Sequence, residues 1–525
     1  MPRSAERAIP HRPLRLAGGA VAALGIAALI ATLFLSIIAV TADHSGGGST
    51  ADIGYLIYIT TLQATLSTVL SLLVGIALAW ALNRLRFVGR PLVIGLFAAA
   101  IVTPGLVIAF GLLAVWGRAG WLGGLGVPIF GLGGVVAAHI ILDGAFAARI
   151  LLTRLDALPD LRLKTGQSLG LTAWTRFVVI DWPALRGTLP GLAAIIFLLA
   201  FTSFPIVLLL GGGPAVQTLE VAIYAAVRLD FDLAMAVKLA LIQIALCTAV
   251  ILASAALTPV SSSLDRSASP RWRDGPAARA LQWLVLLLAL AGFAAPLLAV
   301  LVNGVAGLPA VLTRPSFWSA TTTSLVVASV SAVLALLLAI VIALARAATP
   351  SRMARVALGA PSYAYLAVPA VALALGAFLF VRELGILPET AAPAVVVVAN
   401  ALLTLPFAMA TLAPPLDAIA RSRGRLIRSL GLTGTRQFVA VEWPLIARDA
   451  GLVLALGFCF SLGDLGVIAL FDTHDFVTLP LLMSRALGSY RTTDAATIAA
   501  LMLTLTLVAF IALPALFERL SRARA

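Results

Sequence analysis

Residues 168–183 read SLGLTAWTRFVVIDWP, and residues 429–444, which lie 261 positions later, read SLGLTGTRQFVAVEWP. The alignment needs no gap, and the tripeptide at 155–157 recurs at the same offset at 416–418. Each copy is polar and basic within a strongly apolar chain, and the offset is close to half of the 525 residues. The sequence therefore contains an internal duplication. Since the clearest match is a hydrophilic loop, we expect this loop to perform one task twice.

The composition excludes a soluble protein. Hydrophobic residues make up 61% of the chain and charged residues 11%, whereas a soluble domain carries about 25% charged residues. The net charge of +14 does not indicate nucleic-acid binding, because the basic residues lie between apolar spans rather than in a stripe with aromatic residues. Cys247 and Cys459 fall inside apolar spans and the four histidines are scattered, so we expect no metal site. The fold class is an all-α polytopic membrane protein.

About twelve segments have the length of a membrane-spanning helix, which needs about 20 mostly apolar residues. The predicted spans are 16–41, 55–82, 92–116, 131–152, 187–210, 234–257, 280–304, 317–345, 356–381, 392–413, 449–471 and 495–517. The first is expected to remain uncleaved, because its apolar run exceeds the 7–15 residues of a signal peptide.

Lysine and arginine predict the orientation. Of the 36 lysines and arginines, 28 lie in the two termini and the even-numbered connections, and only about seven lie in the odd-numbered ones. The positive side of a membrane protein is cytoplasmic. We therefore expect both termini and both copies of the repeated loop to face the cytoplasm.

Six spans in each half return the chain to its starting side, so the halves are predicted to be parallel six-helix repeats. The first repeat is expected to cover 1–258 with its loop at 154–186, and the second to cover 280–525 with its loop at 415–448. The basic segment 259–279 is expected to be a cytoplasmic linker. Transport proteins commonly place their pathway between such repeats.

Each loop is expected to form two short helices that meet at a glycine. Gly170 and Gly431 occupy the turn, where glycine permits a left-handed backbone that other residues resist. Pro183 and Pro444 stand just before the next span. The matched spacing of Gly, Phe, Trp and Pro favours a loop that fits a partner's groove over a solvated connection retained by chance.

Both loops share one pattern, which is a glycine, then nine residues, then Ile or Val, then two residues and a proline. This pattern resembles the "EAA" loop of ATP-binding-cassette (ABC) importer permeases. The resemblance implies a type I ABC importer permease fold, in which each loop is a coupling helix that docks into a cytoplasmic ATPase subunit. Lys164 and Arg425 stand where the family has its glutamate, so the charge of the contact with the ATPase must differ here. The positions implied to couple to the ATPase are Lys164, Gly170, Ile180, Trp182 and Pro183 in the first loop and Arg425, Gly431, Val441, Trp443 and Pro444 in the second.

Further segments are similar to the fused permeases of thiamine and thiamine pyrophosphate importers in bacterial inner membranes. They include GRAGWL at 117–122, LGGGP at 210–214 and SLGDLGV at 461–467. The resemblance implies that two ATPase subunits and a periplasmic thiamine-binding protein are partners, that ATP and Mg²⁺ bind to the ATPase subunits, and that this chain binds no cofactor. In agreement, the sequence has no phosphate-binding Gly-x-x-x-x-Gly-Lys-[Ser/Thr] loop.

The same architecture could carry ferric iron or another small ligand. A proton- or sodium-coupled carrier also commonly has twelve spans, but it has no reason to keep two long matched cytoplasmic loops. A membrane-embedded enzyme would need a nucleophile–base set or a metal cluster, and the sequence offers neither. We therefore expect a transport subunit rather than an enzyme.

Four polar residues inside the predicted spans are candidates for the substrate pathway. Ionisable residues within a membrane are functional candidates by default. Asp464 lies well inside a span and could offset the charge of the thiamine cation, bond helix backbone at a kink, or act in gating without contacting the substrate. Ser203 is its counterpart in the first half. His139 and Asn400 are counterparts of each other and could line the pathway, with interhelical hydrogen bonding as the alternative.

Overall fold

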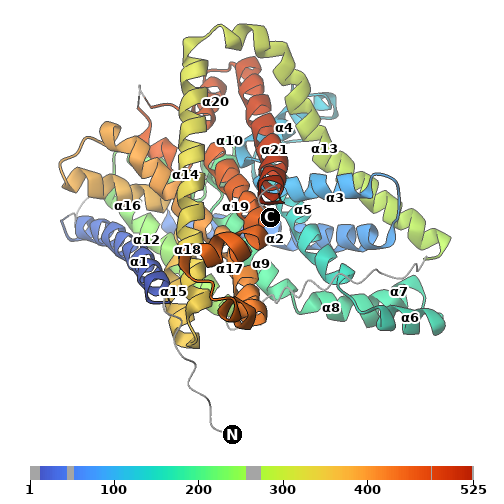
Figure 1. Ribbon diagram of the computed structural model, residues 1–525. Coiled ribbons are helices and arrows are strands. Elements are labelled where there is room, and N and C mark those ends of the chain that lie inside the picture. Colours follow the sequence, from blue (N-terminus) through green and yellow to red (C-terminus); the bar gives the residue numbers. More distant parts are fainter. Residues whose placement is uncertain (1–11, 44–51, 256–273, 474–475, 523–525) are drawn as a thin grey trace.

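In a membrane, backbone N–H and C=O groups must be paired within the protein, so apolar runs of this length form helices. The computed structural model describes residues 12–43, 52–255, 274–473 and 476–522, and every regular element in these ranges is a helix (Figure 1). Residues 259–273 of the predicted linker lie outside the described residues. In the first half the elements are α1 (Arg12–Asp43), α2 (Ile53–Arg84), α3 (Arg90–Ala99), η1 (Ala100–Val102), α4 (Gly105–Trp116), η2 (Gly123–Leu125), α5 (Leu132–Asp156), α6 (Asp160–Ser168), α7 (Ala173–Arg176), η3 (Phe177–Asp181), α8 (Trp182–Arg186), α9 (Leu189–Phe201), α10 (Phe204–Leu210), η4 (Pro214–Val216), α11 (Leu219–Arg228) and α12 (Leu233–Ala255).

The second half repeats this order with fewer breaks. Its elements are α13 (Pro276–Leu312), α14 (Pro315–Ala348), α15 (Arg352–Ala364), α16 (Ala370–Glu383), α17 (Pro388–Ser429), α18 (Gly434–Gln437), η5 (Phe438–Glu442), α19 (Trp443–Leu462), η6 (Ile468–Phe471), α20 (Leu479–Gly488) and α21 (Thr492–Arg522). Most first-half elements have a counterpart about 261 residues later, such as α2 with α14 and α5 with α17.

Nine helices of the described ranges are long and apolar enough to cross a membrane, and two bent pairs bring the number to eleven. The bent pairs are α3–η1 with α4, which meet at 113°, and the α7–α8 segment with α9, which meet at 60°. The predicted span 356–381 is not one helix, because the chain leaves the helix between α15 and α16. Pro369 is the N-cap of α16, and a proline disfavours helical geometry in the residue before it.

The first helix of each half packs against the other half. The helix α1 contacts α14, α15 and α16, and α13 contacts α2 and α4 as well as α21 (Figure 1). Small residues allow both crossings. A Cβ atom added to Gly19 of α1 would lie 2.1 Å from the Cβ of Ala345 on α14, and one added to Gly111 of α4 would lie 2.7 Å from the carbonyl oxygen of Pro296 on α13. The two halves are thus tied together by exchanged helices.

Candidate functional site

The first repeated loop folds as a helix, a left-handed turn and a second helical segment. The short helix α6 ends before Gly170, which has φ +65°. The N–H of Leu171 donates to the carbonyl of Gly166 at 3.2 Å, and that of Gly170 donates to Gln167 at 3.1 Å. These bonds satisfy carbonyls at the helix end, as in a Schellman-type cap. The left-handed glycine predicted from the sequence is confirmed here.

The second loop makes the same turn at the end of a much longer helix. Gly431 has φ +63°, and the N–H of Leu432 donates to the carbonyl of Ile427 at 3.2 Å. The first helix of this loop is the end of α17 rather than a separate element, which differs from the two short helices that we predicted. In the first loop Pro159 starts α6 anew, whereas the matched position 420 is alanine and lets α17 continue.

A turn of π-helix precedes the Trp-Pro pair in both loops, at η3 and at η5. The N–H of Trp182 donates to the carbonyl of Phe177, and that of Trp443 donates to Phe438, each five residues back. The following proline has no N–H with which to continue the regular ladder. Ile180 is buried under this turn, and Trp443 packs against the rings of Phe438 and Phe517. This segment therefore fixes how each loop enters the next span.

Each loop presents apolar side chains on an exposed surface. At matched positions Leu169 and Leu430 are 70% and 62% exposed, and Val178 and Val439 are 45% and 62% exposed. Lys164 and Arg425 are also exposed, in the helix that precedes the glycine. Apolar side chains repeated in this way on a polar loop are typical of a protein-binding surface.

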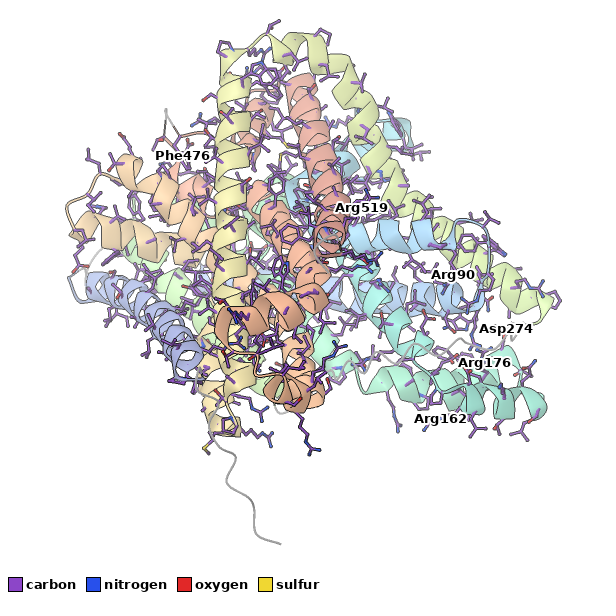
Figure 2. The ribbon with its side chains drawn as sticks, viewed as in Figure 1. Arg90, Arg162, Arg176, Asp274, Phe476 and Arg519 are labelled. Atoms are coloured by element: carbon purple, nitrogen blue, oxygen red, sulfur yellow. The ribbon has the colours of Figure 1, made fainter. Side chains whose placement is uncertain are left out.

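A buried charge network anchors the first loop. Arg84, at the end of α2, pairs with Asp181, the residue before Trp182. Asp274, which precedes α13, lies 3.9 Å from both Arg84 and Arg176 and accepts a hydrogen bond from Gln282 at 2.7 Å. Figure 2 shows Arg176 and Asp274 beside each other, with Arg162 further out on α6. Burial raises the pKa of Asp181, and the nearby guanidinium of Arg84 opposes this rise.

The second loop is anchored at the matched acid. Glu442 accepts two hydrogen bonds from the guanidinium of Arg15, at 2.8 and 2.9 Å, and a third from Gln437 at 2.7 Å. Arg15 also donates to the carbonyl of Gly434 at 3.3 Å. Bidentate charge-assisted bonds of this kind fix geometry as well as adding energy.

The two anchors cross between the halves. Arg15 lies in α1, the first helix of the first half, and binds the second loop. Asp274 lies at the start of α13, the first helix of the second half, and binds Arg176 of the first loop. Each loop is therefore tied to the opposite half through the acid-containing segment before its Trp-Pro pair. The sequence alone does not identify these partners, and its only signal is an acid at the same position of both loops.

The predicted pathway residues occupy different surroundings. Asp464, just after α19, is partly buried, and its Oδ1 accepts from the N–H of Val467 at 3.2 Å. The side-chain amide of Asn400 donates to Ser461 at 2.9 Å and faces the carboxylate of Asp464. Ser203 is the N-cap of α10 and is partly buried. Asp464 therefore bonds helix backbone at a break, as in the alternative interpretation.

His139 does not join this group in any contact of the described residues. Its Nδ1 lies 2.8 Å from the carbonyl of Val135 and 3.3 Å from the amide nitrogen of Gln63 on α2. It links α5 and α2 within the first half, and Asn400 links α17 and α19 within the second. Both residues therefore make interhelical contacts inside their own halves. Within the described ranges, no three His, Cys, Asp or Glu side chains are placed to hold a metal ion.

No family model matches the chain, but similar proteins exist along nearly its whole length. The chain is 37% identical over 490 residues to the thiamine transport system permease protein ThiP of Brucella melitensis biotype 1, covering 89% of each protein. It is 37% identical over 467 residues to the protein of the same name from Escherichia coli K12, covering 85% of this chain and 86% of that one. Over 166 residues it is 30% identical to the molybdenum transport system permease protein ModB of Azotobacter vinelandii, covering 30% of this chain and 74% of ModB.

Proposed function

Because the chain belongs to the thiamine transport system permease family, we propose that it forms the membrane pathway of an ABC importer that brings thiamine from the periplasm into the cytoplasm. It is a multi-pass inner-membrane protein and a transport component rather than an enzyme. Hydrolysis of ATP, with its Mg²⁺, takes place on separate ATPase subunits. A periplasmic thiamine-binding protein delivers the substrate.

The observation that carries this proposal is the duplicated loop geometry. Both loops have a left-handed glycine, a π-turn before Trp-Pro and an exposed leucine and valine at matched positions. Two equal surfaces call for two equal partners, and we propose one ATPase subunit on each. Loops at 154–186 and 415–448 that move with the ATPase dimer would rock the halves between outward and inward access.

The halves and their orientation complete the proposal. We propose parallel repeats at 1–258 and 280–525, a cytoplasmic linker at 259–279 and both termini in the cytoplasm. The match to ModB supports the repeats, since it covers 30% of this chain but 74% of that permease. The excess of lysine and arginine beside the loops supports the orientation, because the positive side of a membrane protein faces the cytoplasm.

The crossed anchors suggest how the loops transmit motion. A loop that is bound to the first helix of the opposite half cannot move without displacing that helix. We propose that Asp181 and Glu442 transmit the movement of the loops to these helices. Asp181 acts through Arg84, which lies near Asp274, and Glu442 acts through Arg15. Asp464 and Ser203, at helix breaks, are proposed to line the pathway, whereas His139 and Asn400 support it through interhelical contacts.

Co-purification with the ATPase subunit, followed by reconstitution into vesicles, tests this function. We expect thiamine uptake that requires ATP and the thiamine-binding protein, with two ATPase subunits in each complex. Vigorous uptake driven by a proton gradient without ATP would overturn it in favour of an ion-coupled carrier. Competition by thiamine pyrophosphate, thiamine monophosphate and ferric iron in the same assay defines the range of substrates.

A further inference from the structure

A second carboxylate lies within electrostatic range of Asp464, on an element of the first half. Glu220 lies in the first turn of α11, in the first half, and its side chain is fully buried. Its carboxylate is close enough to that of Asp464, in the second half, for the two to interact electrostatically. The helices α11 and α12 contact α16, and α11 also contacts η6. The two acids therefore meet where the halves close on each other.

Several polar atoms of this group lack a well-formed hydrogen bond. Five buried atoms make no hydrogen bond of good geometry among the described residues. They are the two carboxylate oxygens of Glu220, the two amide atoms of Gln243 on α12, and Oδ2 of Asp464. Glu220 and Gln243 are both fully buried. The side chain of Gln243 and the backbone N–H of Val371, at the start of α16, interact with the carboxylate of Glu220. Buried polar atoms are nearly always paired, so this cluster calls for a ligand.

A ligand of this site should be positively charged, because Glu220 and Asp464 are both acids. Neither Glu220 nor Asp464 forms an ion pair in the ranges that the structure describes. Two ionised carboxylates within electrostatic range repel each other, and an uncompensated buried charge, as on Glu220, is strongly unfavourable. A cation that enters between them removes both penalties.

The duplication also argues for a ligand rather than for a structural device. The position matched to Glu220 in the second half is Leu481, and the position matched to Asp464 in the first half is Ser203. Each half therefore contributes one acid that its copy lacks. The result is an asymmetric site, which suits a molecule whose charge is at one end.

We propose that Glu220, Asp464 and Gln243 form a binding site for an organic cation in the pathway. The inference rests on the proposed function and assigns the thiazolium of thiamine to the two carboxylates. The amide of Gln243, which can donate and accept, serves the uncharged aminopyrimidine ring. The two acids belong to different halves, so closing the halves brings them together around the cation and opening them releases it.

The test uses the complete reconstituted complex with Glu220→Gln, Asp464→Asn and Glu220→Asp. Asp143→Asn is the matched control, because it neutralises another buried acid, on α5. Uptake of radiolabelled thiamine, binding of thiamine to the complex in nanodiscs and ATP hydrolysis without thiamine are measured per assembled complex. We expect Glu220→Gln and Asp464→Asn each to lower thiamine binding and uptake at least tenfold. The Asp143→Asn control should stay within about threefold of wild type in all three measurements, whereas Glu220→Asp should bind thiamine more tightly than Glu220→Gln.

The outcomes separate this inference from the proposed function. Thiamine binding within twofold of wild type in both Glu220→Gln and Asp464→Asn would overturn the site, and so would a Glu220→Asp variant as impaired as Glu220→Gln, since shape and not charge would then matter. Either result leaves ATP-driven thiamine import standing. Failure of the wild-type complex to import thiamine would instead overturn the proposed function. If Glu220→Gln does not assemble, Asp464→Asn and Glu220→Asp decide the question.

Discussion

Replacing Arg15 by methionine should detach the second loop from α1 while leaving the spans folded. Arg15 holds Glu442 through two hydrogen bonds of 2.8 and 2.9 Å and reaches the carbonyl of Gly434 at 3.3 Å. Methionine keeps a long apolar side chain but removes the charge and every donor. Glu442 then keeps only its bond from Gln437.

The size of the effect follows from the burial of the pair. The side chain of Arg15 is 18% exposed and that of Glu442 is 7% exposed, so the pair is neither free in solvent nor fully buried. A hydrogen bond to a charged group contributes about 1.5–3 kcal/mol, and breaking a fully buried pair costs about 3–5 kcal/mol. We therefore expect Arg15→Met to destabilise the attached loop by about 2 kcal/mol. Since about 1.4 kcal/mol is a factor of ten, the detached state should become roughly 30 times more populated.

Hydrogen exchange followed by mass spectrometry measures this population directly. In Arg15→Met, amides of residues 431–442 should exchange roughly 30 times faster, while those of residues 170–181 in the first loop should not change. Thiamine transported per ATP hydrolysed should fall as well, because the second loop no longer moves α1. Arg352→Met is the matched control, since Arg352 is an exposed arginine on α15.

Unchanged exchange at residues 431–442 in Arg15→Met would refute the anchoring argument. The charge swap that combines Arg15→Glu with Glu442→Arg provides a second check. If the two residues interact directly, the double variant should recover part of the loss caused by each single change. Simple addition of the two losses would show that the pair does not act as a unit.

Three further predictions concern the loops. Gly170→Ala should lower thiamine transport and leave membrane insertion intact, because a side chain at φ +65° costs about 1–2 kcal/mol; Gly187→Ala, with φ −70° and open space around the added Cβ, is the control and should transport normally. Val178→Asp should weaken co-purification of the ATPase at least tenfold, whereas Val88→Asp, also at an exposed valine, should not; equal retention in both would count against the docking surface. Arg84→Met should lower the melting temperature of the purified protein more than Arg15→Met does, since it leaves the fully buried Asp181 without its ion-pair partner at a cost of about 3–5 kcal/mol, and an equal or smaller shift would contradict the buried network.

Much of the fold could be predicted from local signals. Apolar runs of about 20 residues mark most of the spans, because their length and composition alone decide whether a segment can cross a membrane. The repeated glycine marks the left-handed turn of each loop, since a positive φ is a property of the single residue that adopts it. The prediction of one helix at 356–381 is wrong, because apolar composition alone does not reveal that the helix is interrupted before Pro369.

The candidate site could be predicted only in part. Asp464 stands out because an acid inside an apolar span is rare, whereas Glu220 lies in a short segment between spans where an acid attracts no notice. Its place in the proposed site follows from complete burial within electrostatic range of Asp464, 244 residues away in the chain. The pairing of Arg15 with Glu442 could not be predicted either, because the two residues lie 427 positions apart in the chain.

The sequence by itself determined that this protein spans a membrane and carries two matched loops, because hydrophobic length, charge bias and a gap-free repeat are properties of the linear order of residues. Only the tertiary structure decided which residues act together. The exchange of α1 and α13 between the halves brings Arg15 to Glu442 and Asp274 to Arg176. Pairing energies depend on distance in space and on burial, and neither is a property of the one-dimensional order of residues.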